Sequence, residues 1–328
     1  METMPVTLAD VADAARRLDG RAVRTPLLES PLLNEQLGGR LLVKAECLQL
    51  TGSFKFRGAF NKIAQLSAEE RRRGLIAYSS GNHAQGVAAA ARYLNAPALI
   101  VMPADAPAIK VANTKAWGAD VVCYDRHGES REAIAERIMA ERGLALVRPY
   151  DDPAVIAGQG TVGLEIAEDC KARGIAPDAA VICCGGGGLT AGIATALSGL
   201  VPGIVLHTAE PAGWDDTARS LAAGTRQRNE GSLPSLCDAL LAPTPGELTF
   251  AINRKLVRSG VALAESDIVA AMAAAHRYFK LVAEPGGAVA LAAALSGVIP
   301  VAGRTVVVTL SGGNVDAALY AKLLGRAA

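Results

Sequence analysis

A run of four glycines, Gly185 to Gly188, follows the apolar stretch AAVICC and opens the helical pattern LTAGIATALSG. Glycines allow consecutive backbone N–H groups to curl around an anion, and the positive end of the helix dipole adds to the attraction. The spacing differs from the GxGxxG dinucleotide motif, and no Lys-Ser/Thr pair follows as it does in a Walker loop. The run therefore predicts a phosphate site. The alternative is a tight turn that only lets the helix pack on its strand.

Lys55 lies between Phe54 and Phe56 at the expected start of a helix. Loss of solvation between aromatic rings and the positive end of the helix both disfavour the ammonium form, so both lower the pKa of this lysine. A lysine with a lowered pKa suits Schiff-base chemistry with an aldehyde cofactor. Taken alone, the residue also fits an ordinary lysine at the start of an amphipathic helix.

Two further polar stretches each follow an expected strand. The sequence SSGNH (79–83) offers two hydroxyls, an amide and the free N–H groups of a helix start, which together suit a carboxylate. The sequence SGGN (311–314) follows the last expected strand. On their own, His83 is also explained as a hydrogen-bonding residue at a helix start, and Ser311 as a simple N-cap.

An acidic loop, EPAGWDD (210–216), follows another expected strand and carries Glu210 and Asp216 six positions apart. Hard cations such as Mg²⁺ prefer a few protein oxygens and several waters. The loop is therefore a candidate cation site, and the alternative is a polar loop with an Asp N-cap.

The elements that must position these residues alternate between short apolar runs and helical patterns. Strands are expected at 41–47, 74–80, 97–103, 119–125, 144–150, 179–184, 203–210, 260–264 and 304–310, and helices at 82–95, 130–143 and 266–279, the last with Ser266 as N-cap. The strands are continuous apolar runs, which is typical of parallel sheets buried on both faces. This pattern predicts an α/β fold with two open, mostly parallel sheets and flanking helices. We expect a large discontinuous domain (1–73 and 149–328) and a small one (74–148).

Composition excludes several classes of protein. The chain has 328 residues, 51% of them hydrophobic, and a formal net charge of +1, which gives no footprint for nucleic acid or an anionic membrane. No apolar run is long enough for a membrane span, and the N-terminus lacks the apolar core of a signal peptide. Six cysteines without CxxC pairing predict buried, reduced thiols and a cytoplasmic protein.

Taken together, these motifs resemble those of the fold type II pyridoxal-phosphate enzymes, the tryptophan synthase beta family. Within that family, the serine/threonine dehydratase and serine racemase branch is the most similar. The resemblance covers nearly the whole chain, because nine stretches occur in order: SFKFRGA, SSGNHAQG, MPADAPAIKVANTKAWGA, RPYDDPAVIAGQGTVGLEI, GGGGL, AEP, PGELTF, AEPGGA and LSGGN. It implies a tryptophan synthase beta-like fold with a mobile small domain.

The resemblance also implies roles for individual residues. Lys55 would bind pyridoxal 5′-phosphate covalently and act as the base at the substrate α-carbon, with Ser80 on the opposite face of the cofactor. Phe54 would lie against the pyridine ring, Asn82 would bond its 3-hydroxyl, Gly185, Gly186, Gly187 and Gly188 would hold the phosphate, and Ser311 would face the ring nitrogen. Ser79, Ser80, Gly81, Asn82 and His83 would receive the substrate carboxylate.

A divalent cation is implied as well, on Glu210, the main-chain carbonyl of Trp214, and Asp216. Mg²⁺ is the first candidate, with Mn²⁺ and Ca²⁺ as others. Trp214 departs from the small residue expected there, although only its main-chain oxygen is required. A homodimer that acts on a small amino acid is also expected from the resemblance.

The activity implied is an ammonia-lyase reaction that eliminates water from a 3-hydroxy amino acid. L-Threonine, L-serine and 3-hydroxyaspartate all fit, and the last needs a further cation, for which Arg131 and Arg148 are candidates. One enzymatic alternative is a serine racemase-like activity. The other is a cysteine synthase-like β-replacement, which His83 and the run of four glycines disfavour because such enzymes usually carry threonines at both places. The non-enzymatic alternative is a ligand-sensing module on the same fold.

Overall fold

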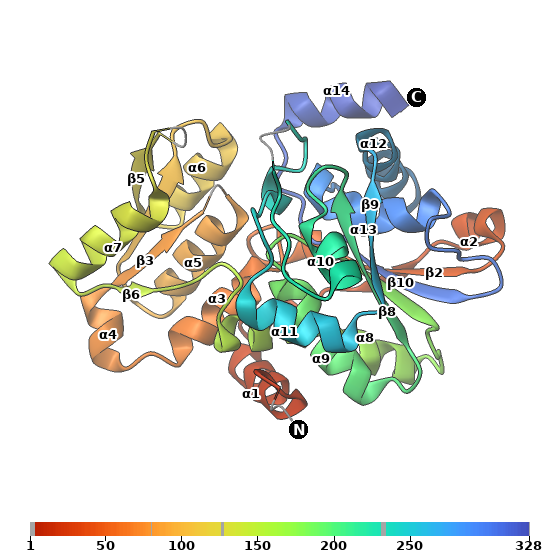
Figure 1. Ribbon diagram of the computed structural model, residues 1–328, viewed down its shortest axis with the longest axis horizontal. Coiled ribbons are helices and arrows are strands. Elements are labelled where there is room, and N and C mark those ends of the chain that lie inside the picture. Colours follow the sequence, from red (N-terminus) through yellow and green to blue (C-terminus); the bar gives the residue numbers. More distant parts are fainter. Residues whose placement is uncertain (1–3, 80, 126–127, 231–233, 328) are drawn as a thin grey trace.

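Two sheets organise the chain, and each forms the centre of one lobe (Figure 1). The computed structural model describes residues 4–79, 81–125, 128–230 and 234–327. The larger sheet has the order β1 (Leu27–Glu29), β2 (Arg40–Lys44), β10 (Thr305–Thr309), β7 (Ala179–Cys183), β8 (Val205–Pro211), β9 (Ser259–Leu263). All neighbouring strands in it are parallel except β1 and β2.

The smaller sheet is entirely parallel and has the order β5 (Asp120–Tyr124), β4 (Ala98–Pro103), β3 (Leu75–Tyr78), β6 (Ala145–Leu146). Helices α4 (Ala68–Arg73), α5 (Asn82–Tyr93), α6 (Ala108–Ala116) and α7 (Arg131–Arg142) belong to this lobe, at the left of Figure 1. Helix α3 (Lys55–Ala64) packs against it as well, because Phe56, Ala59 and Ile63 share its buried core. The division of the chain into two domains at residues 74 and 148 stays a prediction.

The other helices surround the larger sheet. They are α1 (Leu8–Leu18), α2 (Pro31–Leu37), α8 (Pro153–Ala172), α9 (Gly188–Leu200), α10 (Asp216–Ala223), α11 (Glu247–Leu256), α12 (Glu265–Ala274), α13 (Pro285–Leu295) and α14 (Ala317–Ala327). Short 3₁₀ turns lie at η1 (Glu46–Leu48) and η2 (Asp238–Leu240), and a π-helical turn (Ala275–Phe279) extends α12. Because both faces are covered, successive residues of β2 and β10 are buried without alternation.

Helices α8 and α9 approach each other closely because glycines lie at their contact. A Cβ on Gly192 would lie 2.4 Å from the carbonyl oxygen of Ile156, and one on Gly160 would lie 2.9 Å from the carbonyl oxygen of Gly192. Helix α9 begins at Gly188, the last glycine of the run 185–188. The contact with α8 therefore fixes the helix that directly follows the glycine run.

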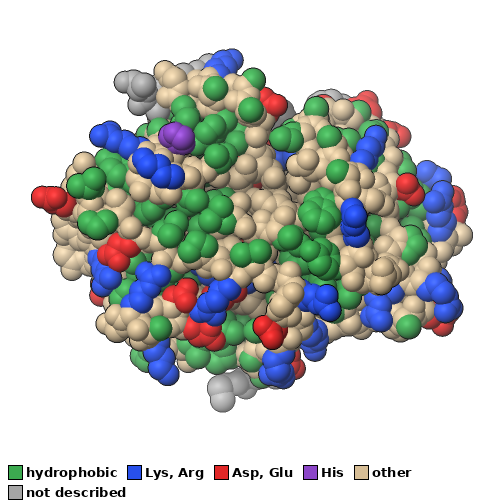
Figure 2. Space-filling view, turned by 180° about the vertical axis from the view of Figure 1, so that it is seen from behind, with side chains coloured by type: hydrophobic (Ala, Val, Ile, Leu, Met, Phe, Trp, Pro, Cys, Tyr) green, Lys and Arg blue, Asp and Glu red, His purple; other side chains and the backbone are tan. Residues whose placement is uncertain are grey.

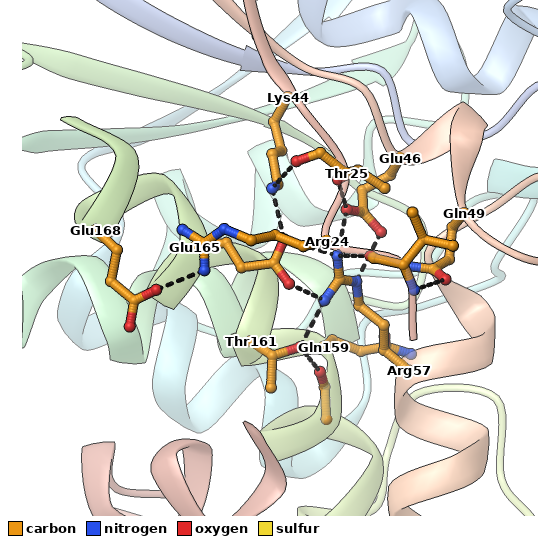
Figure 3. A network of polar contacts seen from close by, with 12 residues as sticks. Arg24, Thr25, Lys44, Glu46, Gln49, Arg57, Gln159, Thr161, Glu165 and Glu168 are labelled. Carbon is orange, nitrogen blue, oxygen red and sulfur yellow. Dashed lines mark hydrogen bonds and ion pairs between the residues drawn. The ribbon is translucent and has the colours of Figure 1, made fainter. Parts of the chain in front are cut away.

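A buried network of charges anchors the first turns of α3 to α8 and β2 (Figure 3). The Arg57 guanidinium pairs with Glu46 at 2.8 Å and with Glu165 at 2.6 Å, and Lys44 pairs with the same Glu165 at 2.5 Å. The side chains of Arg57, Glu46 and Lys44 are at most 1% exposed. Two cations thus balance two anions, which offsets the desolvation of each.

All nine expected strands are present, so the fold class predicted from the sequence is confirmed. The short strand β1 was not expected. The N-cap of α12 is Ala264, and Ser266 lies inside the helix, so that prediction was wrong. The expectation that all six thiols are buried was wrong for Cys123, which is exposed on the edge strand β5. Among the described residues no helix is long and apolar enough to cross a membrane.

Candidate active site

A pocket lies where strands of both sheets end, and it brings most of the expected residues together. Its lining includes Phe54, Lys55, Ser79, Asn82, His83, the glycines 185–188 and Ser311. In an open parallel sheet, ligands bind beyond the carboxyl ends of the strands, and β3, β7 and β10 each end here. Ser80 lies outside the described residues, and Gly81 is buried next to the lining without being part of it.

Lys55 is the first residue of α3 and points its amine across the pocket. Its Nζ donates a hydrogen bond to the Pro149 carbonyl oxygen at 2.7 Å and lies 5.2 Å from the centroid of the Phe54 ring. Loss of solvation lowers the pKa of Lys55 to about 8. Roughly a tenth of this amine is therefore uncharged at pH 7, far more than for an ordinary lysine, and the uncharged form is the one that nucleophilic and basic roles require.

The glycine run forms a tight turn between β7 and α9. Gly187 has φ +91°, a conformation that side-chain-bearing residues rarely adopt, and it is the N-cap of α9. The Gly186 carbonyl accepts a hydrogen bond from Thr249 Oγ1 at 2.8 Å, which turns it toward α11. A Cβ on Gly186 would lie 2.4 Å from the Tyr150 ring. The turn is thus a cradle that only glycine can form, and it fits a phosphate held by main-chain N–H groups.

The residues 81–83 form the start of α5, where Asn82 and His83 line the pocket. The Nε2 of His83 lies 2.9 Å from the Val147 carbonyl oxygen, so it carries the proton and donates. Burial, together with the charge of Lys55, lowers the pKa of His83 to about 3. The ring is therefore neutral, and a carboxylate at this place would be held by the N–H groups of the first helical turn.

Asn82 and Ser311 face the pocket from opposite sheets. The Oδ1 of Asn82 accepts a hydrogen bond from Asn314 Nδ2 at 2.9 Å, which orients the amide. Ser311 follows β10, and its carbonyl oxygen accepts a hydrogen bond from Phe54 N at 3.2 Å. This link holds the residue before Lys55 next to the end of β10. Ser311 thus brings a neutral hydroxyl-bearing side chain to the pocket lining.

The acidic loop forms a separate cluster, at the end of β8. The carboxylate of Glu210 accepts hydrogen bonds from the N–H groups of Thr217 and Ala218, at 3.0 and 2.7 Å. Asp216 is buried, and its Oδ2 has no hydrogen-bond partner within the described part of the chain. Burial and the charge of Asp216 raise the pKa of Glu210, and burial raises the pKa of Asp216 to about 6.

These two buried carboxylates fit a divalent cation, because an unpartnered anionic oxygen there is costly without one. No cluster of three or more His, Cys, Asp or Glu side chains suited to a metal occurs within the described ranges. A cation here would therefore need a main-chain oxygen as a further ligand. Trp214 lies in the turn between the two carboxylates, with its N–H bonded to the Pro211 carbonyl at 3.0 Å.

Several lining residues were not assigned from the sequence. Tyr78, Tyr150, Cys183 and the segment 238–242 complete the walls. Arg131, the first residue of α7, also lines the pocket, whereas Arg148 is exposed and is not among the lining residues described. Tyr150 packs on the glycine turn and belongs to the stretch RPYDDPAVIAGQGTVGLEI, although no role was assigned to it. The segment 238–242 lies in none of the stretches that carry the resemblance.

Comparisons with known proteins agree with this geometry. Residues 19–312 match the family model described as pyridoxal-phosphate dependent enzyme. L-threo-3-Hydroxyaspartate ammonia-lyase of Saccharomyces cerevisiae is 41% identical over 97% of this chain and 96% of its own length. L-Threonine ammonia-lyase of Thermotoga maritima is 41% identical over 98% of this chain and 79% of its own. The crystal structure of a threonine deaminase from T.th. superposes with a TM-score of 0.89 at 45% identity, covering 94% of this chain and 99% of that one. The chain therefore belongs to the family of pyridoxal-phosphate dependent enzymes.

Proposed function

We propose that this chain is an ammonia-lyase that uses pyridoxal 5′-phosphate to eliminate water from a 3-hydroxy amino acid, giving a 2-oxo acid and ammonia. The observation that carries the proposal is one pocket holding an amine of lowered pKa, a glycine cradle and the neutral hydroxyl of Ser311. The names of the relatives, ammonia-lyases for L-threo-3-hydroxyaspartate and L-threonine, support the same reaction.

The residues present fit the cofactor. The N–H groups of Gly185 to Gly188 would hold its phosphate, Phe54 would lie against its ring, and Lys55, Asn82 and Ser311 would contact its aldehyde carbon, 3-hydroxyl and ring nitrogen. When bound, the cofactor supplies an electron sink for the bond broken at the substrate α-carbon.

The chain's own side chains then perform the proton movements. Neutral Lys55 removes the α-proton, and the Pro149 carbonyl, 2.7 Å from its Nζ, keeps the amine directed into the pocket. The substrate carboxylate is received at the start of α5, by Asn82 and His83. The residues just before the helix, Ser79, Ser80 and Gly81, contribute to the same binding. The β-hydroxyl takes up one proton, which balances the proton that Lys55 removed from the α-carbon, and leaves as water. The released enamine tautomerises to an imine, which a second water hydrolyses to the 2-oxo acid and ammonia.

The substrate that the pocket favours is 3-hydroxyaspartate, because a cation is available for its second carboxylate. The Arg131 guanidinium carbon lies 5.2 Å from the centroid of the Tyr78 ring, and its Nε pairs with Glu132 at 2.8 Å. Arginine binds carboxylates through two parallel N–H bonds. Tyr78 and Glu132 hold the arginine at the pocket wall.

Steady-state kinetics with L-threo-3-hydroxyaspartate, L-threonine and L-serine test this preference. Arg131→Met should lower kcat/KM for hydroxyaspartate roughly ten- to a hundredfold, since a charged hydrogen bond contributes about 1.5–3 kcal/mol, and should leave threonine nearly unchanged. Arg148→Met, which changes an exposed arginine, is the matched control. Equal losses on all three substrates would instead mean that Arg131 binds the α-carboxylate common to them.

The role of Lys55 is tested separately. Borohydride treatment of the loaded protein should attach the cofactor mass to the peptide that contains Lys55, and Lys55→Ala should abolish both that adduct and 2-oxo acid formation. An adduct on another lysine, or turnover by the variant, would rule out the assigned role.

The alternatives are distinguished by their products. A racemase would convert L-serine to D-serine faster than to pyruvate, and a β-replacement enzyme would consume an added thiol. A ligand-sensing module would bind the cofactor and an amino acid without turnover. If Ser311 faces the ring nitrogen as proposed, it would leave that nitrogen without a charged partner and so weaken the electron sink that the cofactor supplies, which would favour prompt loss of the β-substituent.

We also propose a divalent cation, Mg²⁺, Mn²⁺ or Ca²⁺, on Glu210, Asp216 and the Trp214 carbonyl, supported by the unpartnered Asp216 oxygen. A homodimer is supported by hydrophobic side chains that lie in several groups across the face seen in Figure 2. Light scattering on the purified protein tests whether its mass is that of a dimer.

Free thiols support a cytoplasmic location, and cell fractionation tests this location.

A further inference from the structure

Lys110 is a buried lysine whose partners lie on the other lobe. It belongs to α6, at the left of Figure 1, and its side chain is 2% exposed. Its Nζ lies 2.7 Å from Asp238 Oδ2 and 3.0 Å from Glu284 Oε2. Asp238 begins η2 and Glu284 is the N-cap of α13, both in the lobe of the larger sheet. One ammonium therefore bridges the two lobes directly behind the pocket.

The Glu284 carboxylate connects this ammonium to a residue that lines the pocket. Its Oε1 accepts a hydrogen bond from Asn82 Nδ2, and Asn82 Oδ1 accepts one from Asn314. An amide with an acceptor on one side and a donor on the other has a single orientation. Lys110, by holding Glu284, fixes which end of the Asn82 amide faces each neighbour.

The same lysine also contacts both walls of the pocket. A Cβ on Gly81 would lie 2.2 Å from Lys110 Cδ, so the aliphatic stem packs against the turn that precedes α5. On the opposite wall, Asp238 begins the segment 238–242, all of which lines the pocket. Lys110 therefore touches the carboxylate-binding turn with its stem and holds the facing wall with its charge.

We propose that Lys110 is a positioning residue that sets the two walls of the cofactor pocket against each other, through Glu284 to Asn82 on one side and through Asp238 to the segment 238–242 on the other. The proposal rests on the proposed function only for its kinetic readout. The structural readout below requires neither substrate nor turnover.

The charges make this bridge hard to replace. Burial opposes the ammonium, but the carboxylates of Glu284 and Asp238 outweigh it and raise the pKa of Lys110 to about 12. The lysine is thus a cation throughout the working pH range. Without it, the Glu284 side chain would keep Asn82 as its one side-chain donor among the described residues, Asp238 would lose its cation, and the two walls would lose their shared partner.

Hydrogen–deuterium exchange of the cofactor-free and the loaded protein tests the proposal. Lys110→Met should speed exchange about tenfold or more in both residues 81–94 and residues 234–242, while α8 and α9 exchange as in the unsubstituted protein. Asp238→Asn should speed exchange in 234–242 alone. Lys115→Met, on the exposed side of the same helix, should change neither segment.

The kinetic readout is kcat/KM for the preferred hydroxy amino acid, which Lys110→Met should lower roughly ten- to a hundredfold, and Lys115→Met should not. Unchanged exchange in both segments of Lys110→Met, or equal acceleration of both by Asp238→Asn, would overturn the proposal. If Lys110→Met does not fold, Asp238→Asn decides alone. If no hydroxy amino acid is turned over at all, the proposed function fails while the exchange comparison still stands.

Discussion

Replacing Arg57 by Met should destabilise the protein strongly, and the buried network gives the size of the effect. The five N–H groups of the Arg57 guanidinium make six hydrogen-bond contacts, one N–H of Nη2 being shared: two each to Glu46 and Glu165 and one each to Thr161 and the Val23 carbonyl. In Arg57→Met, Lys44 still pairs with Glu165, but Glu46 keeps only the Thr25 hydroxyl. The Glu46 carboxylate would then be buried without its directly paired cation, and only the more distant charge of Lys44 would still act on it.

Breaking a buried ion pair from one side costs about 3–5 kcal/mol. That is a large share of the roughly 5–15 kcal/mol by which folded proteins are stable. Arg24→Met is the matched control, because Arg24 is half exposed and pairs with Glu168 and Asp169 at the surface. Such exposed pairs contribute about 0–1 kcal/mol, so this variant should remain close to the unsubstituted protein.

The loss in Arg57→Met should depend on pH in a defined direction. Burial would raise the pKa of Glu46, but the charge and hydrogen bonds of Arg57 outweigh it and hold that pKa below 4.5. In the unsubstituted protein, the contribution of Glu46 is therefore present above pH 4.5 and is lost as the pH falls further. In the variant, burial is opposed only by the charge of Lys44 and the hydrogen bond from Thr25, so the pKa of Glu46 should rise. The penalty is then largest at neutral pH and shrinks in acid as Glu46 takes up a proton.

Urea unfolding of the two variants at pH 5, 7 and 8 measures these free energies. The gap between Arg57→Met and the unsubstituted protein should widen from pH 5 to pH 8, and adding Glu46→Gln should recover part of it. A gap no larger than that of Arg24→Met, or one that narrows as the pH rises, would refute the assignment of a charged, balanced network.

Three other predictions concern the groups around the pocket. The rate of cofactor capture by the cofactor-free protein should rise with pH about a midpoint near 8, because only the neutral Lys55 amine attacks the aldehyde; a midpoint near the ordinary 10.5 in stopped-flow absorbance would contradict this. Saturating Mg²⁺ should raise the thermal midpoint, since ligand at 100 times its Kd adds about 2.7 kcal/mol, and Glu210→Gln should lose that rise in calorimetry. Gly186→Ala should weaken cofactor binding roughly five- to a hundredfold in a fluorescence titration, because the added Cβ meets the Tyr150 ring at 2.4 Å and overpacking costs about 1–3 kcal/mol; Gly325→Ala, in open space, should bind normally.

Site residues could be predicted from the sequence where a single short stretch indicates their chemistry. Lys55 between aromatic rings and the glycine run after an apolar strand each have a pattern of their own, and the structure brings them to one pocket. The buried parallel strands could be predicted as well, because each one is a continuous apolar run in a single short stretch. The strand β1 has only three residues and pairs at the edge, so it lacks such a run.

The contacts that were missed join distant parts of the chain. Lys110 lies 128 positions from Asp238 and 174 from Glu284, so no local pattern in the sequence links these three residues. The sequence did not indicate which of Arg131 and Arg148 reaches the pocket. Arg131 lines it because α7 begins at that residue, and this placement depends on the tertiary fold. Ser266 has the right residue type for a cap, but the helix begins one residue before it, at Glu265.

The place of β10 in the larger sheet has a consequence for biosynthesis. This strand lies between β2 and β7, although it follows them by more than a hundred residues in the sequence. While the ribosome is still translating, β2 and β7 must wait with open edges for a neighbour that emerges some 265 and 126 residues later, counting from Arg40 and Ala179 to Thr305. Unpaired edges invite association with other nascent chains. The yield of folded protein in cells should therefore depend on chaperone supply, whereas dilute, full-length chains should refold with much less need of chaperones.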